Sequence, residues 1–280
     1  MQYLPIVSAS NPAVKAAKRL ATQPRFAREQ GLSLAEGIHL ARELAAHSAY
    51  VRKIFLREGA EKNPEIRTVL AQFESADLVC LVLPPGLFAS ICPVEASAGI
   101  ICEIQIPQDG IIKKGQDTIF LDGVQDPGNV GTIIRLSLAS GVTNIALSSQ
   151  CAYVWSPKVL RAAMGAHFYC NIVPSADIER VKEDSAAECL VADARGGKDL
   201  YEEAWGEQPS LWVFGSEGLG VTEKALVLAD KTLLIPLDPR VESLNVGTAA
   251  AVCLFEQKRR RLRRKKSREH LPREIYQKGP

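Results

Sequence analysis

The chain has 280 residues, 46% hydrophobic and 24% charged, a balance that predicts a globular protein with a substantial core and, from its length, about two domains. The longest apolar run, residues 78–83, is too short to span a bilayer, and residues 1–20 lack the apolar stretch of a secretory signal. We therefore expect a cytoplasmic protein with no membrane partner. Seven cysteines without a Cys-x-x-Cys pair and four scattered histidines predict neither a disulfide framework nor a metal site.

The net charge of +2 conceals a strongly basic end of the chain. Residues 258–280 hold eleven Lys and Arg against two Glu, a local charge of +9, so the first 257 residues carry −7. Dense like charges repel one another, and we expect this basic tail to be frayed or disordered until a polyanion binds it. RNA is the polyanion that we expect, and a solvated, passive end is the alternative.

Residues 1–107 are predicted to form a small α/β domain. Ser10-Asn11-Pro12 supplies a capping side chain and a first-turn proline before a helix over residues 14–21. A second helix is predicted over residues 36–47, and β-rich runs predict strands at 51–56, 78–83 and 100–106. The polar, turn-rich residues 108–116 are the expected linker to the next domain.

Residues 117–257 alternate strand and helix patterns at short intervals. Strands are predicted at residues 118–121, 144–147, 168–173, 189–192, 211–214 and 232–236. Helices are predicted to begin near residues 130, 157, 177, 222 and 246. This alternation is typical of a largely parallel sheet, whose ligands lie beyond the carboxyl ends of its strands.

Three loops of this second domain carry candidate functional residues. In the first, Asp126-Pro127-Gly128-Asn129 follows a strand and opens a helix that carries Arg135, although a helix cap and a surface arginine would give the same pattern. The second loop, residues 213–220, has three glycines that let the backbone approach a ligand, without the spacing of a dinucleotide or Walker motif. The third pairs Ile235-Pro236 with Ser243-Leu244-Asn245, where a simple helix cap is the alternative.

Together, in order and spacing, the three loops resemble the signature motifs of the SpoU (TrmH-like) branch of the SPOUT RNA methyltransferases, over about residues 118–257. The N-terminal part is more loosely similar to that family's ribosomal-protein-like RNA-binding domain, through Asn11-Pro12-x-x-Lys15 and Glu36-Gly37. The resemblance implies an α/β chain with a trefoil-knotted, parallel-sheet catalytic domain behind a small RNA-binding domain. It also implies a homodimer that uses S-adenosyl-L-methionine and no metal, and residues 258–280 lie outside the family pattern.

The resemblance assigns site residues by position in these motifs. The implied cofactor contacts are Gly215, Ile235 and Leu244. The implied catalytic positions, for methyl transfer to a ribose 2′-hydroxyl, are Asn129, Arg135, Glu217, Ser243 and Asn245.

The residue types suit these assignments. A guanidinium stays protonated at neutral pH, so we expect Arg135 to bind a phosphate and stabilise charge on the 2′-oxygen rather than act as a base. Asn129, Ser243 and Asn245 are expected to orient the ribose and cofactor by hydrogen bonding. Glu217 is expected to hold the arginine or to organise the loop between them.

Three other functions stay open at this point. The extra N-terminal domain favours ribosomal RNA as the substrate, with transfer RNA as the alternative. A non-catalytic RNA-binding or assembly protein on the same fold is disfavoured, since Asn129, Arg135, Ser243 and Asn245 are all present. Fold alone does not decide between a base and a ribose methyltransferase, so the choice depends on the loops. The Asn-to-Arg spacing and Ser243-Leu244-Asn245 favour the ribose.

Overall fold

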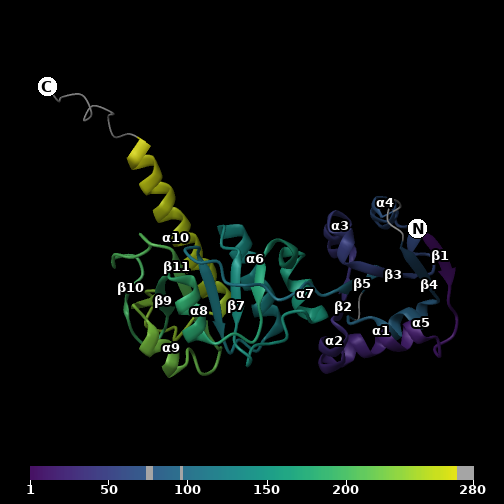
Figure 1. Cartoon of the computed structure of the whole chain (residues 1–280), viewed down its shortest axis with the longest axis horizontal. Coiled ribbons are helices and arrows are strands. Elements are labelled where there is room, and N and C mark those ends of the chain that lie inside the picture. The colour runs from purple at the N-terminus through teal and green to yellow at the C-terminus, as the bar shows by residue number, and fades with distance from the viewer. Residues whose placement is uncertain (74–77, 95–96, 270–280) are drawn as a thin grey trace.

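Two β-sheets, each with its own helices, lie side by side along the longest axis of the molecule (Figure 1). The computed structural model describes residues 1–73, 78–94 and 97–269. The N-terminal sheet has five strands and the second sheet has seven. The α/β fold predicted from the sequence is confirmed.

The N-terminal sheet is mixed, in the order β1-β4-β3-β5-β2. Its strands are β1 (Gln2–Pro5), β2 (Leu32–Glu36), β3 (Val51–Arg57), β4 (Val79–Leu83) and β5 (Ile100–Gln105). Strands β1, β4 and β3 are parallel, whereas β5 runs antiparallel to both β3 and β2. Its helices are α1 (Pro12–Thr22), α2 (Pro24–Gln30), α3 (Ile38–Ala46), α4 (Pro64–Gln72) and α5 (Pro85–Ile91).

The sequence predicted only part of this domain. The start of α1 is confirmed, because the Asn11 side chain accepts a hydrogen bond from the Ala13 amide and Pro12 occupies the first turn. The helix predicted from residue 36 begins at Ile38 instead, since Glu36 is the last residue of β2. Strands β1 and β2 and helices α2, α4 and α5 were not predicted, and the strongest pattern in each is too short to stand out.

The second sheet is parallel throughout, in the order β10-β12-β9-β11-β6-β7-β8. Its strands are β6 (Thr118–Asp122), β7 (Asn144–Leu147), β8 (Asn171–Val173), β9 (Glu188–Ala192), β10 (Lys198–Asp199), β11 (Ser210–Gly215) and β12 (Lys231–Leu234). Its helices are α6 (Pro127–Ser140), α7 (Pro157–Ala163), α8 (Ile178–Ser185), α9 (Glu223–Leu228) and α10 (Val246–Glu269).

Most strands of the second sheet match their predictions within two residues, because they are buried on both faces and appear as continuous apolar runs. The strand predicted at 168–173 is an exception. Its first residues form a 3₁₀ helix, η3 (Ala166–Tyr169), and only Asn171–Val173 pair with β7. The trefoil knot implied by the family resemblance stays a prediction.

The two sheets are joined by buried polar contacts as well as by an apolar cluster shared between them. The hydroxyl of Ser33, in β2, donates to the carbonyl of Trp155 at 2.5 Å, and both residues are buried. The Arg161 guanidinium, in α7, meets the buried Glu36 carboxylate at 3.3 Å. These contacts fasten β2 of the N-terminal sheet to α7 of the second.

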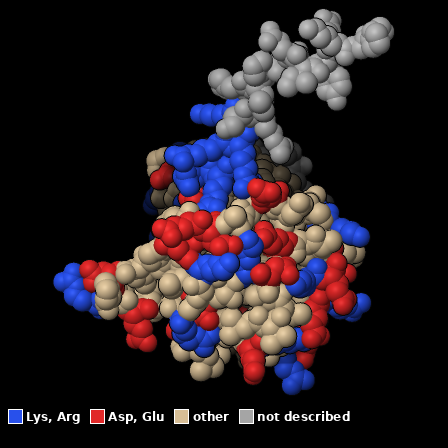
Figure 2. Space-filling view, turned by 90° about the vertical axis from the view of Figure 1, so that its left-hand side faces the viewer, with Lys and Arg blue, Asp and Glu red and all other residues tan. Residues whose placement is uncertain are grey.

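The last helix corrects the prediction of a frayed basic tail. Helix α10 continues without interruption from Val246 to Glu269, so residues 258–269 are helical, while 270–280 lie outside the described residues. Figure 2 shows Lys and Arg side chains gathered along α10, above a surface where carboxylates are frequent. Arg260 donates to the carbonyls of Leu200 and Glu203 and lies over the Trp205 ring at 4.4 Å, and Arg261 pairs with Asp117. The expected repulsion is therefore offset by partners on the folded body.

Candidate active site

A cavity of about 640 Å³ opens at the carboxyl ends of β9, β11 and β12, beside the start of α10. Its lining comprises residues 192–195, 214–220, 233, 235, 237, 242–246 and 249. Six residues singled out from the sequence are among them: Gly215, Glu217, Ile235, Ser243, Leu244 and Asn245. The cavity lies where a parallel sheet places its ligands.

The loop after β11 turns back sharply on itself. The backbones of Ser216 and Gly220 exchange two hydrogen bonds, of 2.9 and 3.0 Å. A Cβ atom on Gly215 would lie 2.2 Å from backbone atoms of Gly220 and Val221, so no larger residue fits there. Gly220 has φ +71°, a left-handed conformation that favours glycine. The glycines of this loop thus permit a close backbone crossing rather than a phosphate cradle.

Three candidate catalytic side chains form a continuous chain of hydrogen bonds. The Asn129 amide donates to the Glu217 carboxylate at 2.7 Å, and the Asn245 amide donates to the Asn129 oxygen at 3.0 Å. The Asn245 oxygen in turn accepts from the amides of Gly247 and Thr248 at the start of α10. Residues from all three predicted loops, up to 116 positions apart, therefore meet at the edge of the cavity.

Arg135 lies apart from this chain of hydrogen bonds. It is exposed on α6 and is not among the residues that line the cavity. Within residues 1–73, 78–94 and 97–269, its side chain makes no hydrogen bond or ion pair. Glu217 was expected either to hold Arg135 or to organise the loop between them; in the described residues its carboxylate accepts from Asn129 and makes no contact with Arg135.

The segment after β9 was not among the residues singled out from the sequence. Asp193, Ala194 and Arg195 line the cavity, and the Arg195 guanidinium pairs with the Asp193 carboxylate at 3.0 Å. Burial alone would raise the pKa of Asp193, but hydrogen bonds and charge from Arg195 outweigh it and hold that pKa below its ordinary value. The signal was present, since 189–192 was a predicted strand and ligands lie beyond carboxyl ends.

The cavity combines apolar walls with carboxylates. Phe214, Leu233, Ile235 and Leu244 supply surfaces that suit a flat aromatic group such as adenine. Asp193, Glu217 and Glu242 line the same space, and because Arg195 offsets only the charge of Asp193, the lining stays net negative and suits a ligand that carries positive charge. This donor set fits S-adenosylmethionine, which has an adenine ring, a sulfonium and an ammonium group.

In the part of the chain that the structure describes, no group of three or more His, Cys, Asp or Glu side chains is arranged to hold a metal ion. No described helix is both long enough and apolar enough to cross a bilayer.

Comparisons with known proteins agree with this architecture. The SpoU rRNA Methylase family matches residues 117–255. An uncharacterised tRNA/rRNA methyltransferase of Synechocystis is 32% identical, over 91% of this chain and 93% of its own. The 23S rRNA (guanosine(2553)-2′-O)-methyltransferase RlmP of Bacillus subtilis is 28% identical, over 89% and 97%. The mitochondrial rRNA methyltransferase 3A of Danio rerio is 29% identical, and the match spans 66% of its length.

Solved structures extend the likeness to nearly the whole chain. An RNA 2′-O ribose methyltransferase superposes with a TM-score of 0.77 at 25% identity, over 92% of this chain and all of the other. An AdoMet-bound rRNA methyltransferase of Sinorhizobium meliloti shares the fold, with a TM-score of 0.79 at 24% identity, over 93% and 99%. The family match over residues 117–255, which include the three loops, and the 32% identity to a relative matched over 93% of its length agree with the geometry above: this chain belongs to the SpoU rRNA methylase family.

Proposed function

We propose that this protein transfers the methyl group of S-adenosylmethionine to a ribose 2′-hydroxyl of ribosomal RNA. The observation that carries the proposal is the hydrogen-bonded chain Glu217–Asn129–Asn245 at the edge of a cavity lined by Gly215, Ile235 and Leu244. The names of the Bacillus relative and of the aligned 2′-O ribose methyltransferase support the same reaction.

The cavity residues hold the cofactor in this proposal. Gly215, Ile235 and Leu244 would offer apolar surface and close backbone approach to an adenosine, and the Glu242 carboxylate, which lines the same cavity, would attract the positively charged groups. When bound, S-adenosylmethionine supplies a methyl group on a positively charged sulfur, and a ribose 2′-oxygen displaces that sulfur in line. The hydroxyl proton would pass to a substrate phosphate or to water.

The loop residues position the substrate. Asn129 and Asn245 are fixed by each other and by Glu217, so the second N–H of each side-chain amide is preorganised to donate to a ribose, with the exposed Ser243 nearby in sequence. Arg135 has the free, planar fork of donors that suits a phosphate next to the reacting sugar. Its charge stabilises the oxygen as its proton leaves.

The N-terminal domain, residues 1–107, is the proposed RNA-holding part. Lys15, Lys18 and Arg19 are exposed on α1, and they provide positive charge on a chain whose first 257 residues are net acidic. The cytoplasmic location of the protein stays a prediction. So does the binding of RNA by residues 258–280.

We further propose that the protein is a homodimer. Phe255 and Leu262 are 44% and 54% exposed and lie seven residues apart, so they share one face of α10. Helix α10 packs on α6, which carries Arg135. An interface over these two helices would cover the apolar face, and light scattering on the purified protein should give twice the chain mass.

The decisive test is mass-spectrometric mapping of ribose methylations in total RNA from cells with and without the gene. Loss of one 2′-O-methyl from ribosomal RNA, restored by the wild-type gene and not by Asn129→Ala, is the expected result. Loss from transfer RNA would change the substrate, and loss of a base methylation would change the reaction. Unchanged methylation with altered ribosome assembly would favour the non-catalytic alternative.

A further inference from the structure

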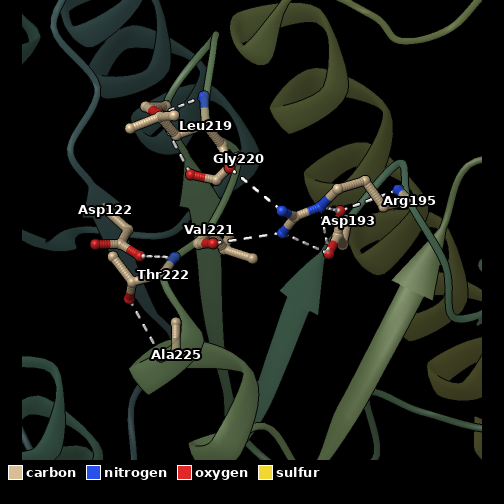
Figure 3. Close-up of polar contacts among 9 residues, drawn as sticks. Asp122, Asp193, Arg195, Leu219, Gly220, Val221, Thr222 and Ala225 are labelled. Atoms are coloured by element: carbon tan, nitrogen blue, oxygen red, sulfur yellow. Dashed lines mark hydrogen bonds and ion pairs between the residues drawn. The ribbon is translucent and has the colours of Figure 1, made fainter.

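Arg195 joins the end of β9 to the loop that follows β11 (Figure 3). Its guanidinium is anchored by Asp193: Nε and Nη2 each donate to the carboxylate at 3.0 Å, and the Arg195 backbone amide donates to it at the same distance. From this anchor, Nη1 reaches the Leu219 carbonyl at 3.3 Å and Nη2 reaches the Val221 carbonyl at 3.4 Å. One side chain therefore holds both sides of Gly220.

The approach of Arg195 depends on Gly220. A Cβ atom at that position would lie 3.2 Å from Arg195 Nη2 and 3.3 Å from Cζ, closer than side chains normally pack. The glycine thus serves two purposes here, since it adopts a positive φ and leaves room for the guanidinium plane.

The same segment is held from the other side by β6. Strand β11 lies between β9 and β6, and Asp122, the last residue of β6, accepts a hydrogen bond from the Thr222 amide at 2.7 Å. Thr222 then caps α9 through its hydroxyl, which accepts from the Ala225 amide. Figure 3 shows these two attachments on opposite sides of the segment. Asp122 is buried, whereas Arg195 is 56% exposed, so the Arg195 attachment is the more open of the two.

We propose that Arg195 is a positioning residue that holds Leu219–Gly220–Val221, and with it the hairpin of Ser216 and Gly220, in the shape that admits the cofactor. The inference rests on the proposed function only for the identity of that cofactor. The hairpin is short, and its tip carries Glu217, which reaches Asn129. Arg195 therefore fixes one wall of the cavity and, through it, the carboxylate that organises the catalytic asparagines.

The matched control is Arg240, which repeats the same local arrangement without the loop contacts. Its backbone amide and its Nε donate to Asp238 at 3.0 and 2.8 Å, and its Nη2 donates at 2.9 Å. Both arginines have a raised pKa, because each donates hydrogen bonds to its aspartate. Arg195→Met and Arg240→Met hence remove the same Asp-x-Arg pair, and only the first removes the link to Leu219 and Val221.

The first measurement is hydrogen exchange on the cofactor-free protein. Arg195→Met should speed exchange of the Ser216 and Gly220 amides at least tenfold, with strands β6 and β11 unchanged, and Arg240→Met should leave these amides at wild-type rates. Unchanged exchange at Ser216 and Gly220 in Arg195→Met would overturn the proposal. If Arg195→Met does not fold, Asp193→Asn removes the anchoring charge at constant size and should speed the same two amides.

The second measurement is calorimetric binding of S-adenosylmethionine, with steady-state kinetics on ribosomal RNA. We expect Arg195→Met to raise Kd and the cofactor KM about tenfold while kcat at saturating cofactor stays within about threefold, because the bound cofactor restores the loop. Arg195→Lys should recover only part of the affinity, since one ammonium cannot hold Asp193 and two carbonyls together. Equal affinity in Arg195→Met, Arg240→Met and wild type would refute the positioning role.

The two proposals fail in distinguishable ways. If the wild type itself binds no S-adenosylmethionine, the proposed function fails, and the exchange rates still decide whether Arg195 holds the loop. If the wild type binds and Arg195→Met binds equally, only the role of Arg195 fails.

Discussion

Arg135 presents its guanidinium on an exposed turn of α6, with no protein partner in the described residues, as a phosphate-binding side chain requires. Arg135→Ala should lower kcat by about 10²–10³, the usual cost of one preorganised stabiliser. Arg135→Lys should rescue poorly, because a point charge lacks the bidentate fork. The cofactor Kd should stay at the wild-type value, since Arg135 does not line the cavity. Near-normal turnover in the lysine variant would refute the role.

Only glycine fits at position 215, because the backbone of Gly220 and Val221 crosses close to it. Gly215→Ala would place a Cβ atom 2.2 Å from backbone atoms of Gly220 and Val221, so the loop must move. We expect a loss of about 1–3 kcal/mol in the free energy of unfolding, and weaker cofactor binding. Gly218→Ala is the comparison in the same loop, because a Cβ atom there meets nothing within 4 Å. Equal urea midpoints for the two variants would show that the close backbone approach at Gly215 does not exclude a larger side chain.

His167 is a buried histidine whose pKa lies well below its ordinary value. Burial lowers its pKa to about 4, Nε2–H donates to the Val154 carbonyl at 2.9 Å, and Nδ1 is buried without a partner in the described structure. The unfolded chain takes up this proton near pH 6.5, whereas the folded chain resists until about pH 4. His167 therefore destabilises the fold increasingly as pH falls between these values, by up to about 3 kcal/mol.

The test compares urea unfolding of the wild type and His167→Gln across that range. As pH falls from 6.5 to 4, the unfolding free energy of the wild type should decrease relative to that of His167→Gln. Above pH 7.5 the difference between the two proteins should stay constant. Parallel curves would show that His167 is not the responsible group.

At the scale of elements, the start of α10 lines the cavity, and its later turns contact the rest of the second domain. Near its middle, the buried Glu256 pairs with Arg259 and Arg260, and these hydrogen bonds and charges hold the pKa of Glu256 below its usual range although burial opposes them. Arg260 is only 13% exposed, since it also caps the carbonyls of Leu200 and Glu203.

A chain that ends at Gln257 should consequently be destabilised, contrary to the expectation for a disordered tail. Removing Arg261 leaves the Asp117 carboxylate, only 17% exposed, without its charged partner, and the Leu200 and Glu203 carbonyls lose Arg260, which together cost about 3 kcal/mol. A chain that ends at Glu269 keeps all the described contacts and is the control. Chemical unfolding of the two truncated chains against the full chain measures the difference, and equal midpoints would contradict it.

The predictability of elements follows their burial. Strands β6, β7 and β11 are buried along their whole length, so their apolar runs identify them in the sequence. Strand β1 is exposed at every position and lies at the edge of its sheet, so its four residues carry no pattern. Strand β2 was not predicted, because its last residue, Glu36, was read as part of the helical pattern of α3.

At the scale of the whole molecule, the proposed mechanism uses the charges and hydrogen bonds of protein side chains and no metal ion. We expect activity in ribosomal RNA methylation to be unchanged after dialysis against a chelator, because the proposed roles of Arg135, Asn129 and Asn245 involve no metal. A parallel assay with added Mg²⁺ controls for effects on RNA folding. Loss of activity that a transition metal alone restores would refute this mechanism.

The sequence by itself determined the α/β class and the parallel second sheet, and it singled out the three loops that meet at the cavity, because apolar runs and short loop motifs are local properties of the chain. Only the tertiary structure decided which residues meet. Asn129 and Glu217 contact each other because β6 and β11 are neighbours in the sheet, and Arg195 reaches the same loop because β9 flanks β11 on the other side. The basic end of α10 is helical for a similar reason: Asp117 pairs with Arg261 and the distant Leu200 carbonyl accepts from Arg260, contacts that the sequence of the tail does not reveal.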